Sequence, residues 1–264
     1  MTALEIPHYF APNRKRAPTH GWIVALTAGV ALAIWQLAVV VGQYPAFILP
    51  APARVARRLI AALADGTLLY HTAITIGEVV AGLALGLTFA AVLGYWLAKS
   101  PAVERFISPY IVASQSIPVV AYAPLLIIWF GSGLLSKVLI CALVVFFPIL
   151  INVVVGLRGV PEELRDVMRS LRASRWQTFL HLELPAALPI LLGGLKIGAT
   201  LSVIGAVVGE FVGADAGLGF LVTLGRGQFD TSLIFVAILA LVLIATSLFG
   251  LISILERRAL RWQQ

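Results

Sequence analysis

The stretch Pro161 to Pro189 reads PEELRDVMRSLRASRWQTFLHLELPAALP and is the longest polar segment in a chain that is otherwise mostly apolar. Apolar residues recur in it at helical spacing, first over 164–171 and again over 176–184, with Ala173 and Ser174 between the two sets. This spacing predicts two short amphipathic helices separated by a break, with Ser174 capping the second helix. We call residues 161–189 the polar loop.

Prolines bound the polar loop at both ends. Pro161 falls where the first turn of a helix tolerates a missing N–H, and the acidic residues Glu162 and Glu163 suit the positive end of that helix. Pro185 and Pro189 are expected to end the helical pattern, because an interior proline removes a backbone donor and clashes one turn back.

The composition of the whole chain predicts an all-α polytopic membrane protein. Of its 264 residues, 60% are hydrophobic and only 12% are charged, which excludes an ordinary soluble domain. A membrane span needs about 20 mostly apolar residues, and six stretches meet this requirement. The six predicted helices cover residues 22–41, 73–98, 107–130, 134–157, 190–211 and 233–255.

The chain has a net charge of +7, and the distribution of its basic residues indicates a membrane topology rather than a nucleic-acid partner. Most basic residues lie near the two ends of the chain, in the polar loop, and between the second and third predicted spans. By the positive-inside rule this side faces the cytoplasm. The chain is therefore expected to cross the plasma membrane several times, with both termini on the cytoplasmic side. Residues 1–20 then form a cytoplasmic tail, and residues 21–264 form one transmembrane domain.

Two predicted spans carry small residues at every fourth position. Such faces let helix backbones approach closely in lipid, where apolar side chains alone give no preference for one partner. We therefore expect the two spans to join a compact helix core. The residues are Gly82, Gly86, Ala90 and Gly94 in the first span, and Gly194, Gly198, Ser202, Gly205 and Gly209 in the second.

The predicted span 107–130 contains Pro118 and Pro124 together with polar residues. Each proline frees a carbonyl, which is tolerated at membrane depth only against protein or a watery cavity, so this span is expected to be kinked or broken and to face a pathway. The candidate residues of the translocation path are Glu78, Gln115, Ser116, Tyr122, Trp129, Ser202 and Glu210.

Charged residues within predicted spans need a reason, since a carboxylate at a helix centre costs about 2.5 to 3.5 kcal/mol on insertion scales. Glu78 and Glu210 either face an outward vestibule or bond to a neighbouring helix. Lys137 is expected to extend its amine to the membrane surface, and Lys196 to do the same or to be paired.

The polar loop resembles the cytoplasmic EAA loop of ABC importer permeases. That pattern begins with an acidic residue and two small residues, followed after three residues by a glycine. After nine further residues it ends with an aliphatic residue, any residue, leucine and proline. Here Asp166-Val167-Met168, Arg172 and Leu182-Glu183-Leu184-Pro185 keep every spacing. Arg172 replaces the glycine, which would permit a left-handed turn that arginine adopts only at a cost, so the turn is expected to differ in shape.

Three further phrases resemble permeases of the group that transports nitrate, sulfonates, taurine, riboflavin and thiamine pyrimidine precursors. They are Phe47 to Pro52 (FILPAP), Gln115 to Pro118 (QSIP), and Gly209 to Gly219 (GEFVGADAGLG). The last is too rich in glycine to continue as a plain helix and is expected to form a turn or re-entrant segment at the outer mouth.

The resemblance implies several partners: separate ATP-binding-cassette ATPase subunits, an extracytoplasmic solute-binding protein and a second copy of this chain, all at the lipid bilayer. The sequence has no G-x-x-x-x-G-K-[ST] loop, so ATP is expected to act on the partner ATPase, with no cofactor bound by this chain and no enzymatic activity of its own. The residues expected to couple to the ATPase, through apolar docking and steering by two arginines, are Asp166, Met168, Arg169, Leu171, Arg172, Ala173, Ser174, Trp176 and Phe179.

The substrate that this resemblance favours is a vitamin or vitamin precursor with a heteroaromatic ring, with aliphatic sulfonates, taurine and nitrate as alternatives. An ion-coupled secondary transporter is the alternative from another class, with Glu78 and Glu210 as ion-coupling groups. The scattered histidines show no metal-ligand spacing, and the single cysteine, Cys141, is expected to be a small buried residue.

Overall fold

The computed structural model describes residues 21–261, and throughout this range the secondary structure is helical. The chain divides into two units, Met1–Pro52 and Ala53–Gln264, each described by itself. The described part of the first unit holds α1 (Gly21–Gly42), which is long and apolar enough to cross a membrane. The predicted tail, residues 1–20, lies outside the described residues.

The second unit contains the remaining helices. Within residues 21–261, five helices are long and apolar enough to cross a membrane, and a sixth crossing results if the bent pair α4 and α5 counts as one. This confirms the all-α polytopic class. The elements are α2 (Pro52–Ala64), α3 (Thr67–Lys99), α4 (Pro101–Gln115), α5 (Val119–Phe130), α6 (Leu134–Arg158), α7 (Glu162–Ser170), α8 (Arg175–Thr178), a π-helical turn (Phe179–Glu183), α9 (Leu184–Gly213), α10 (Leu218–Gly227) and α11 (Thr231–Ala259).

Helix α6 packs between α3 and α9 and forms the core of the second unit. Both small-residue faces meet it: a Cβ atom at Gly82 would lie 2.1 Å from Cβ of Cys141, and one at Gly205 would lie 2.8 Å from Cα of Cys141. Only glycine permits so close an approach on both sides. The predicted helix core and the buried Cys141 are thereby confirmed.

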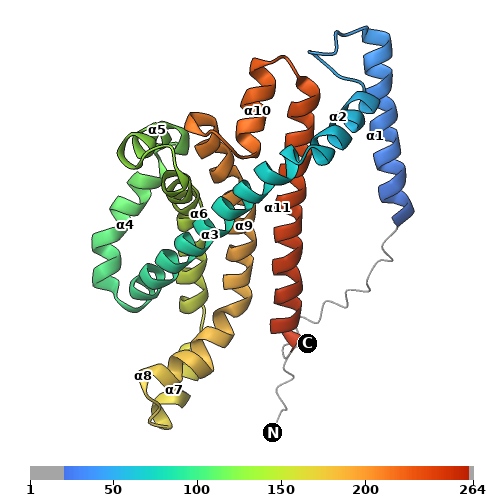
Figure 1. Cartoon of the computed structure of the whole chain (residues 1–264). Helices are drawn as coiled ribbons and strands as arrows, with labels where there is room; N and C mark the ends of the chain where they lie inside the picture. The colour runs from blue at the N-terminus through green and yellow to red at the C-terminus, as the bar shows by residue number, and fades with distance from the viewer. Residues whose placement is uncertain (1–20, 262–264) are drawn as a thin grey trace. The chain divides into compact units, whose positions relative to one another are not determined.

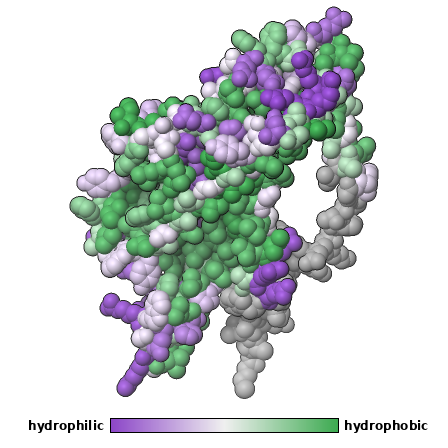
Figure 2. Space-filling model, viewed as in Figure 1, coloured by the Kyte–Doolittle hydropathy of each residue, from purple (hydrophilic) through white to green (hydrophobic). Residues whose placement is uncertain are grey.

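The polar loop and α10 lie at opposite ends of this core (Figure 1). In the space-filling view, hydrophobic residues cover most of the middle of the helix bundle, and hydrophilic residues gather around the polar loop (Figure 2). The apolar middle has the surface expected of a lipid-facing protein.

The predicted span 107–130 is fully broken rather than continuous. Helices α4 and α5 meet at an angle of 96°, and the break covers residues 116–118. Pro118 has an extended ψ of 135° at the start of α5 and has no N–H to continue α4. The expectation of a kinked or broken span is thus confirmed.

Pro185 and Pro189 do not end the helix, contrary to the expectation from sequence. Helical structure continues from Arg175 to Gly213, because the π-helical turn Phe179–Glu183 joins α8 to α9. Pro185 lies in the first turn of α9, where its missing N–H is tolerated, and α9 continues through Pro189. The polar loop is therefore directly continuous with a membrane span.

The glycine-rich stretch after residue 209 forms the predicted turn. Helix α9 ends at Gly213, Gly217 has a φ of 115° that favours glycine, and α10 then packs against α9 and α11. The turn sets the short helix α10 beside the first turns of α11 in Figure 1.

Candidate functional site

The polar loop contains α7, a turn over residues 171–174, and α8, followed by the π-helical turn and the first residues of α9. This confirms the two predicted helices. Ser174 caps α8: its hydroxyl accepts from the N–H of Gln177 (3.2 Å), and the Gln177 side chain accepts from the N–H of Ser174 (2.8 Å). This reciprocal capping box fixes the direction in which α8 leaves the turn.

Arg172 holds the left-handed conformation that a glycine would take at this position, with a φ of 53°. The N–H of Ala173 donates to the carbonyl of Met168 (3.0 Å) and closes the turn behind α7. The left-handed turn therefore forms despite the arginine, and the expectation that it would differ in shape is not supported. The side chain carries the conformational cost instead.

Several of the predicted coupling residues are exposed. Leu171 is 71% exposed and Trp176 is 66% exposed, while Met168 and Ala173 are half-buried. Arg169 pairs with Asp166 (2.7 Å) and Glu162 (2.9 Å), and the hydrogen bond that it donates to Asp166, together with the charge of Glu162, raises the pKa of its guanidinium. The exposed face of the loop is accordingly apolar at its tip and charged along α7.

Phe179 contacts this chain's own helices. Its ring meets Tyr95 of α3 edge-on at 5.4 Å between centroids, and Trp176 stacks on it at 5.6 Å. Trp176 and Phe179 were both expected to dock on a partner. Phe179 packs within the chain, whereas Trp176 presents most of its surface outward.

Glu183 links the polar loop to the membrane helices. Its carboxylate is buried, with 1% of the residue exposed, and it binds Lys99 at the end of α3. Arg165 of α7 lies 3.6 Å from the same carboxylate and donates to the carbonyl of Leu157 at the end of α6 (2.8 Å). One buried acid therefore ties the loop to α3 directly and to α6 through Arg165. Sequence reasoning missed this role because Glu183 occupies a position that the loop pattern leaves free.

A second ion pair lies at the same end of the molecule. Arg158 of α6 forms a two-pronged pair with Glu104 of α4 (2.7 and 2.6 Å) and also donates to the carbonyl of Leu97 (2.9 Å). Such a bidentate pair is among the stronger charged contacts in proteins. It holds the start of α4 against the ends of α3 and α6.

A buried charged network lies near the opposite end of the core. Glu78 of α3 pairs with Lys137 of α6 at 3.4 Å, and Glu210 of α9 accepts from Thr75 of α3 (2.6 Å) and from the N–H of Gly219. Both carboxylates are buried, which agrees with bonding to a neighbouring helix rather than with an open vestibule in this chain. The expectation for Lys137 was wrong: it is 5% exposed, because Glu78 compensates its charge and Gly209 leaves room for its stem.

The same network holds the glycine-rich turn. The N–H of Gly217 donates to His71 Nδ1 (2.9 Å), and the N–H of Leu218 donates to the hydroxyl of Thr75 (2.9 Å). The polar side chains of α3 thus satisfy backbone donors that the turn leaves free. His71 was missed from sequence because the span prediction began at residue 73, whereas α3 begins at Thr67. Thr75 lay inside the predicted span, but a single threonine in an apolar helix gives no signal of its partner.

The other candidate path residues do not form one cluster with the acids. Gln115 and Ser116 are exposed at the break between α4 and α5, and Trp129 is exposed on α5. Tyr122 is half-buried, and Ser202 is buried where the Cys141 thiol donates to its carbonyl (3.4 Å). Lys196 is paired with Glu256 of α11, one of the two alternatives considered for it.

These features define an integral-membrane transport subunit: a tightly packed helix bundle with a broken helix, buried intramembrane charges, and a folded polar loop fastened to the spans. The family model described as "Binding-protein-dependent transport system inner membrane component" matches residues 66–261. The chain belongs to this family and is the non-catalytic permease subunit of an ABC importer in the plasma membrane. Family membership decides against the ion-coupled secondary transporter.

Two relatives are similar along most of their length. The riboflavin transport system permease protein RibX of Chloroflexus aurantiacus is 49% identical over 238 residues, which cover 90% of this chain and 89% of the relative. The formylaminopyrimidine transport permease protein ThiX of Halalkalibacterium halodurans is 35% identical over 234 residues, covering 88% of this chain and 92% of the relative.

A solved structure has the same fold. An inward-facing conformation of the MetNI methionine ABC transporter superposes with a TM-score of 0.66 at 19% identity, covering 74% of this chain and 97% of that chain. At this identity the likeness concerns the arrangement of helices alone.

Proposed function

We propose that this permease subunit carries a small heteroaromatic vitamin or vitamin precursor into the cell, with riboflavin the first choice and a thiamine pyrimidine precursor the second. The observation that carries this proposal is the 49% identity to RibX over 90% of the chain. ThiX, named for a formylaminopyrimidine, supports the same chemical class. Aliphatic sulfonates, taurine and nitrate remain the alternative substrates that the sequence resemblance suggests.

The proposed assembly contains two copies of this chain around one pathway, two ATPase subunits against the polar loops, and a solute-binding protein on the outer side. ATP binds the ATPase subunits, and this chain binds no cofactor. The exposed apolar tip formed by Leu171 and Trp176 supports a docking role, since exposed apolar residues beside charges are typical of protein interfaces.

The proposed mechanism makes the polar loop the moving part. When ATP closes the two ATPase subunits, each would displace α7, and the shared contacts of Glu183 would carry that displacement to the ends of α3, α6 and α9. Nucleotide can shift this equilibrium only by as much as it binds one access state more tightly than the other. A direct helical connection from α8 into α9 supports efficient transmission.

The test is uptake by proteoliposomes that contain this chain, its ATPase and its solute-binding protein. ATP-dependent accumulation of labelled riboflavin or of the pyrimidine precursor is expected, with no uptake when the ATPase cannot hydrolyse ATP. Competition by unlabelled taurine, an alkane sulfonate or nitrate reveals the alternative substrates. Accumulation of one of those solutes, without vitamin uptake, would refute the proposed substrate class while leaving the family intact.

A further inference from the structure

Two cavities adjoin where the polar loop meets the membrane helices. The first, the apolar groove, has a volume of about 420 Å³, with Val153 and Leu157 of α6 at its base. The second, the basic pocket, has a volume of about 670 Å³ and includes Lys99 and Arg175. Both are lined by Tyr95 and Trp96 of α3, so the two cavities form one continuous surface.

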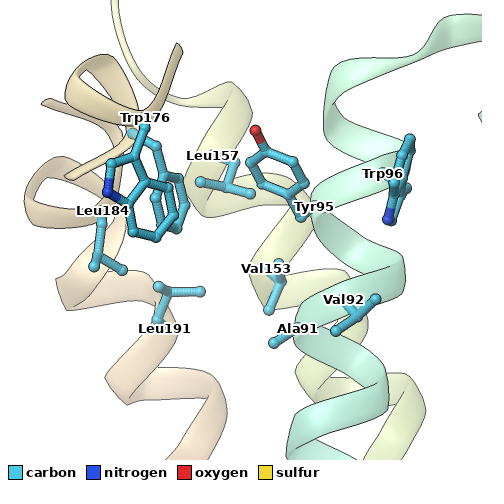
Figure 3. Close-up of a pocket in the computed structure, with 10 residues that line it drawn as sticks. Ala91, Val92, Tyr95, Trp96, Val153, Leu157, Trp176, Leu184 and Leu191 are labelled. Carbon is cyan, nitrogen blue, oxygen red and sulfur yellow. The ribbon is translucent and has the colours of Figure 1, made fainter. Parts of the chain in front are cut away.

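Two structural elements divide their side chains between the cavities according to polarity. Helix α3 gives Val92 to the apolar groove and Lys99 to the basic pocket, and α8 gives Trp176 to the groove and Arg175 to the pocket. Figure 3 shows Trp176, Leu184 and Leu191 across the groove from α3.

The apolar groove and the basic pocket lie at different depths along α3. The groove residues of α3 precede Lys99 by up to eight positions, which corresponds to about 12 Å along a helix. The apolar groove therefore lies towards the membrane interior and the basic pocket at the surface that the positive-inside rule places in the cytoplasm.

The basic pocket carries an excess of positive charge. Four cations line it, Lys99, Arg165, Arg169 and Arg175, together with the carboxylate of Glu183. Three of these cations are ion-paired: Lys99 with Glu183, Arg165 with Glu183 and Glu162, and Arg169 with Glu162 and Asp166. No carboxylate lies within ion-pair distance of Arg175 among the described residues, so Arg175 supplies the excess charge. The Nε of Arg165 lies 3.6 Å from the carboxylate of Glu183, beyond hydrogen-bond distance, and makes no hydrogen bond within the described part of the chain. An anionic group with several acceptor oxygens would satisfy these donors.

We propose that this surface is a binding site for an anionic phospholipid of the inner leaflet. One acyl chain lies in the apolar groove between α3 and α9, and the phosphate headgroup lies in the basic pocket against Arg175 and Arg165. Charge complementarity and the apolar-to-basic order match an amphiphile rather than a free anion, which would leave the groove unfilled. Basic pockets between membrane helices on the cytoplasmic side are suited to anionic headgroups.

The bound lipid contacts both parts of the coupling apparatus. Its headgroup touches α7 and α8, and its chain touches α3, α6 and α9, so the lipid adds a second link beside Glu183 between the polar loop and the spans. The proposal does not depend on which solute is transported.

The test measures lipid retention by native mass spectrometry on the purified full chain in detergent, with phosphatidylglycerol and phosphatidylcholine added separately. Arg175→Gln should weaken phosphatidylglycerol retention about fivefold, the share that one arginine contributes to anionic-surface attraction. Ala91→Phe, which fills the apolar groove, should weaken retention of the same lipid. Arg226→Gln on α10 and Ala84→Phe elsewhere on α3 are matched controls for charge and volume, and both should leave retention unchanged.

Three outcomes overturn the proposal. The first is equal retention of the two lipids, and the second is equal loss in the controls and the test variants. The third is glycerol phosphate, the headgroup without acyl chains, competing as well as the whole lipid, since the site would then hold an anion only. A partner-protein site is indicated instead if neither lipid is retained and only the ATPase protects Trp176 from fluorescence quenching by iodide.

Discussion

Glu183, in the π-helical turn, is ion-paired with Lys99 at the end of α3, 84 positions away in the chain. The carboxylate is buried while Lys99 is about one third exposed, so the acid is enclosed by the fold and the cation reaches it from the edge. Through this pair and Arg165, the polar loop is bonded to the ends of α3 and α6. The contact gives the loop a mechanical connection that its length alone would not provide.

Replacement of Glu183 tests that connection. Glu183→Gln removes the negative charge that Lys99 and Arg165 share. We expect the free energy of unfolding to fall by roughly 1.5 to 3 kcal/mol, which is typical of a hydrogen bond to a charged group. Vesicles should show ATP hydrolysis with much reduced solute uptake. The control Glu163→Gln changes an exposed acid of α7 and should leave both rates unchanged. Equal loss of hydrolysis and uptake in Glu183→Gln would indicate failed assembly rather than uncoupling.

Arg172→Gly should stabilise the protein. Arginine is strained at a φ of 53°, whereas glycine adopts this conformation freely, so a gain of about 1 kcal/mol is expected. Thermal unfolding of the full chain in detergent measures the change. Ser170→Gly is the control, because Ser170 ends α7 in helical conformation and its hydroxyl bonds Asp166, so this change should destabilise. A lower melting temperature for Arg172→Gly would mean that the arginine side chain contributes more than the strain costs.

Gly86→Val should disrupt the helix core. A Cβ at this position would lie 2.4 Å from Cγ2 of Val145 and 2.7 Å from the carbonyl oxygen of Ala142, so α3 and α6 must separate, at a cost of about 1 to 3 kcal/mol or more. Gly77→Val on the same helix is the control, since nothing lies within 4 Å of its Cβ position. Comparable melting temperatures for the two variants would contradict the close packing of α3 on α6.

Thr75→Val should release the glycine-rich turn. The hydroxyl of Thr75 donates to Glu210 and accepts from the N–H of Leu218, so its loss leaves two buried groups unsatisfied, at a cost of about 1 to 3 kcal/mol each. Hydrogen exchange should accelerate at Leu218 and its neighbours. Thr88→Val is the matched control, because the Thr88 hydroxyl is exposed and bonds only its own helix. Unchanged exchange in Thr75→Val would show that other contacts hold the turn.

Much of the fold followed from local pattern. Hydropathy located the span 134–157 to within one residue of α6, because a long and mostly apolar run is stable in lipid as a spanning helix. Helical spacing predicted α7 and α8, and the four-residue repeat of small residues predicted the faces that meet α6. Each of these signals depends on residues near one another in the chain.

The tertiary structure alone decided the partners of the charges and the fate of the prolines. Sequence could identify Glu78 and Lys137 as charges within spans, yet it could not show that they meet each other, nor that Glu183 would be buried against Lys99. Nor could it show that a π-helical turn would carry α8 past Pro185 into α9. The physical reason is the same in both cases. Hydropathy and helical period depend on residues that are neighbours in the chain. Whether a charge or an unpaired backbone group can be buried depends on partners that only folding brings within a few ångströms.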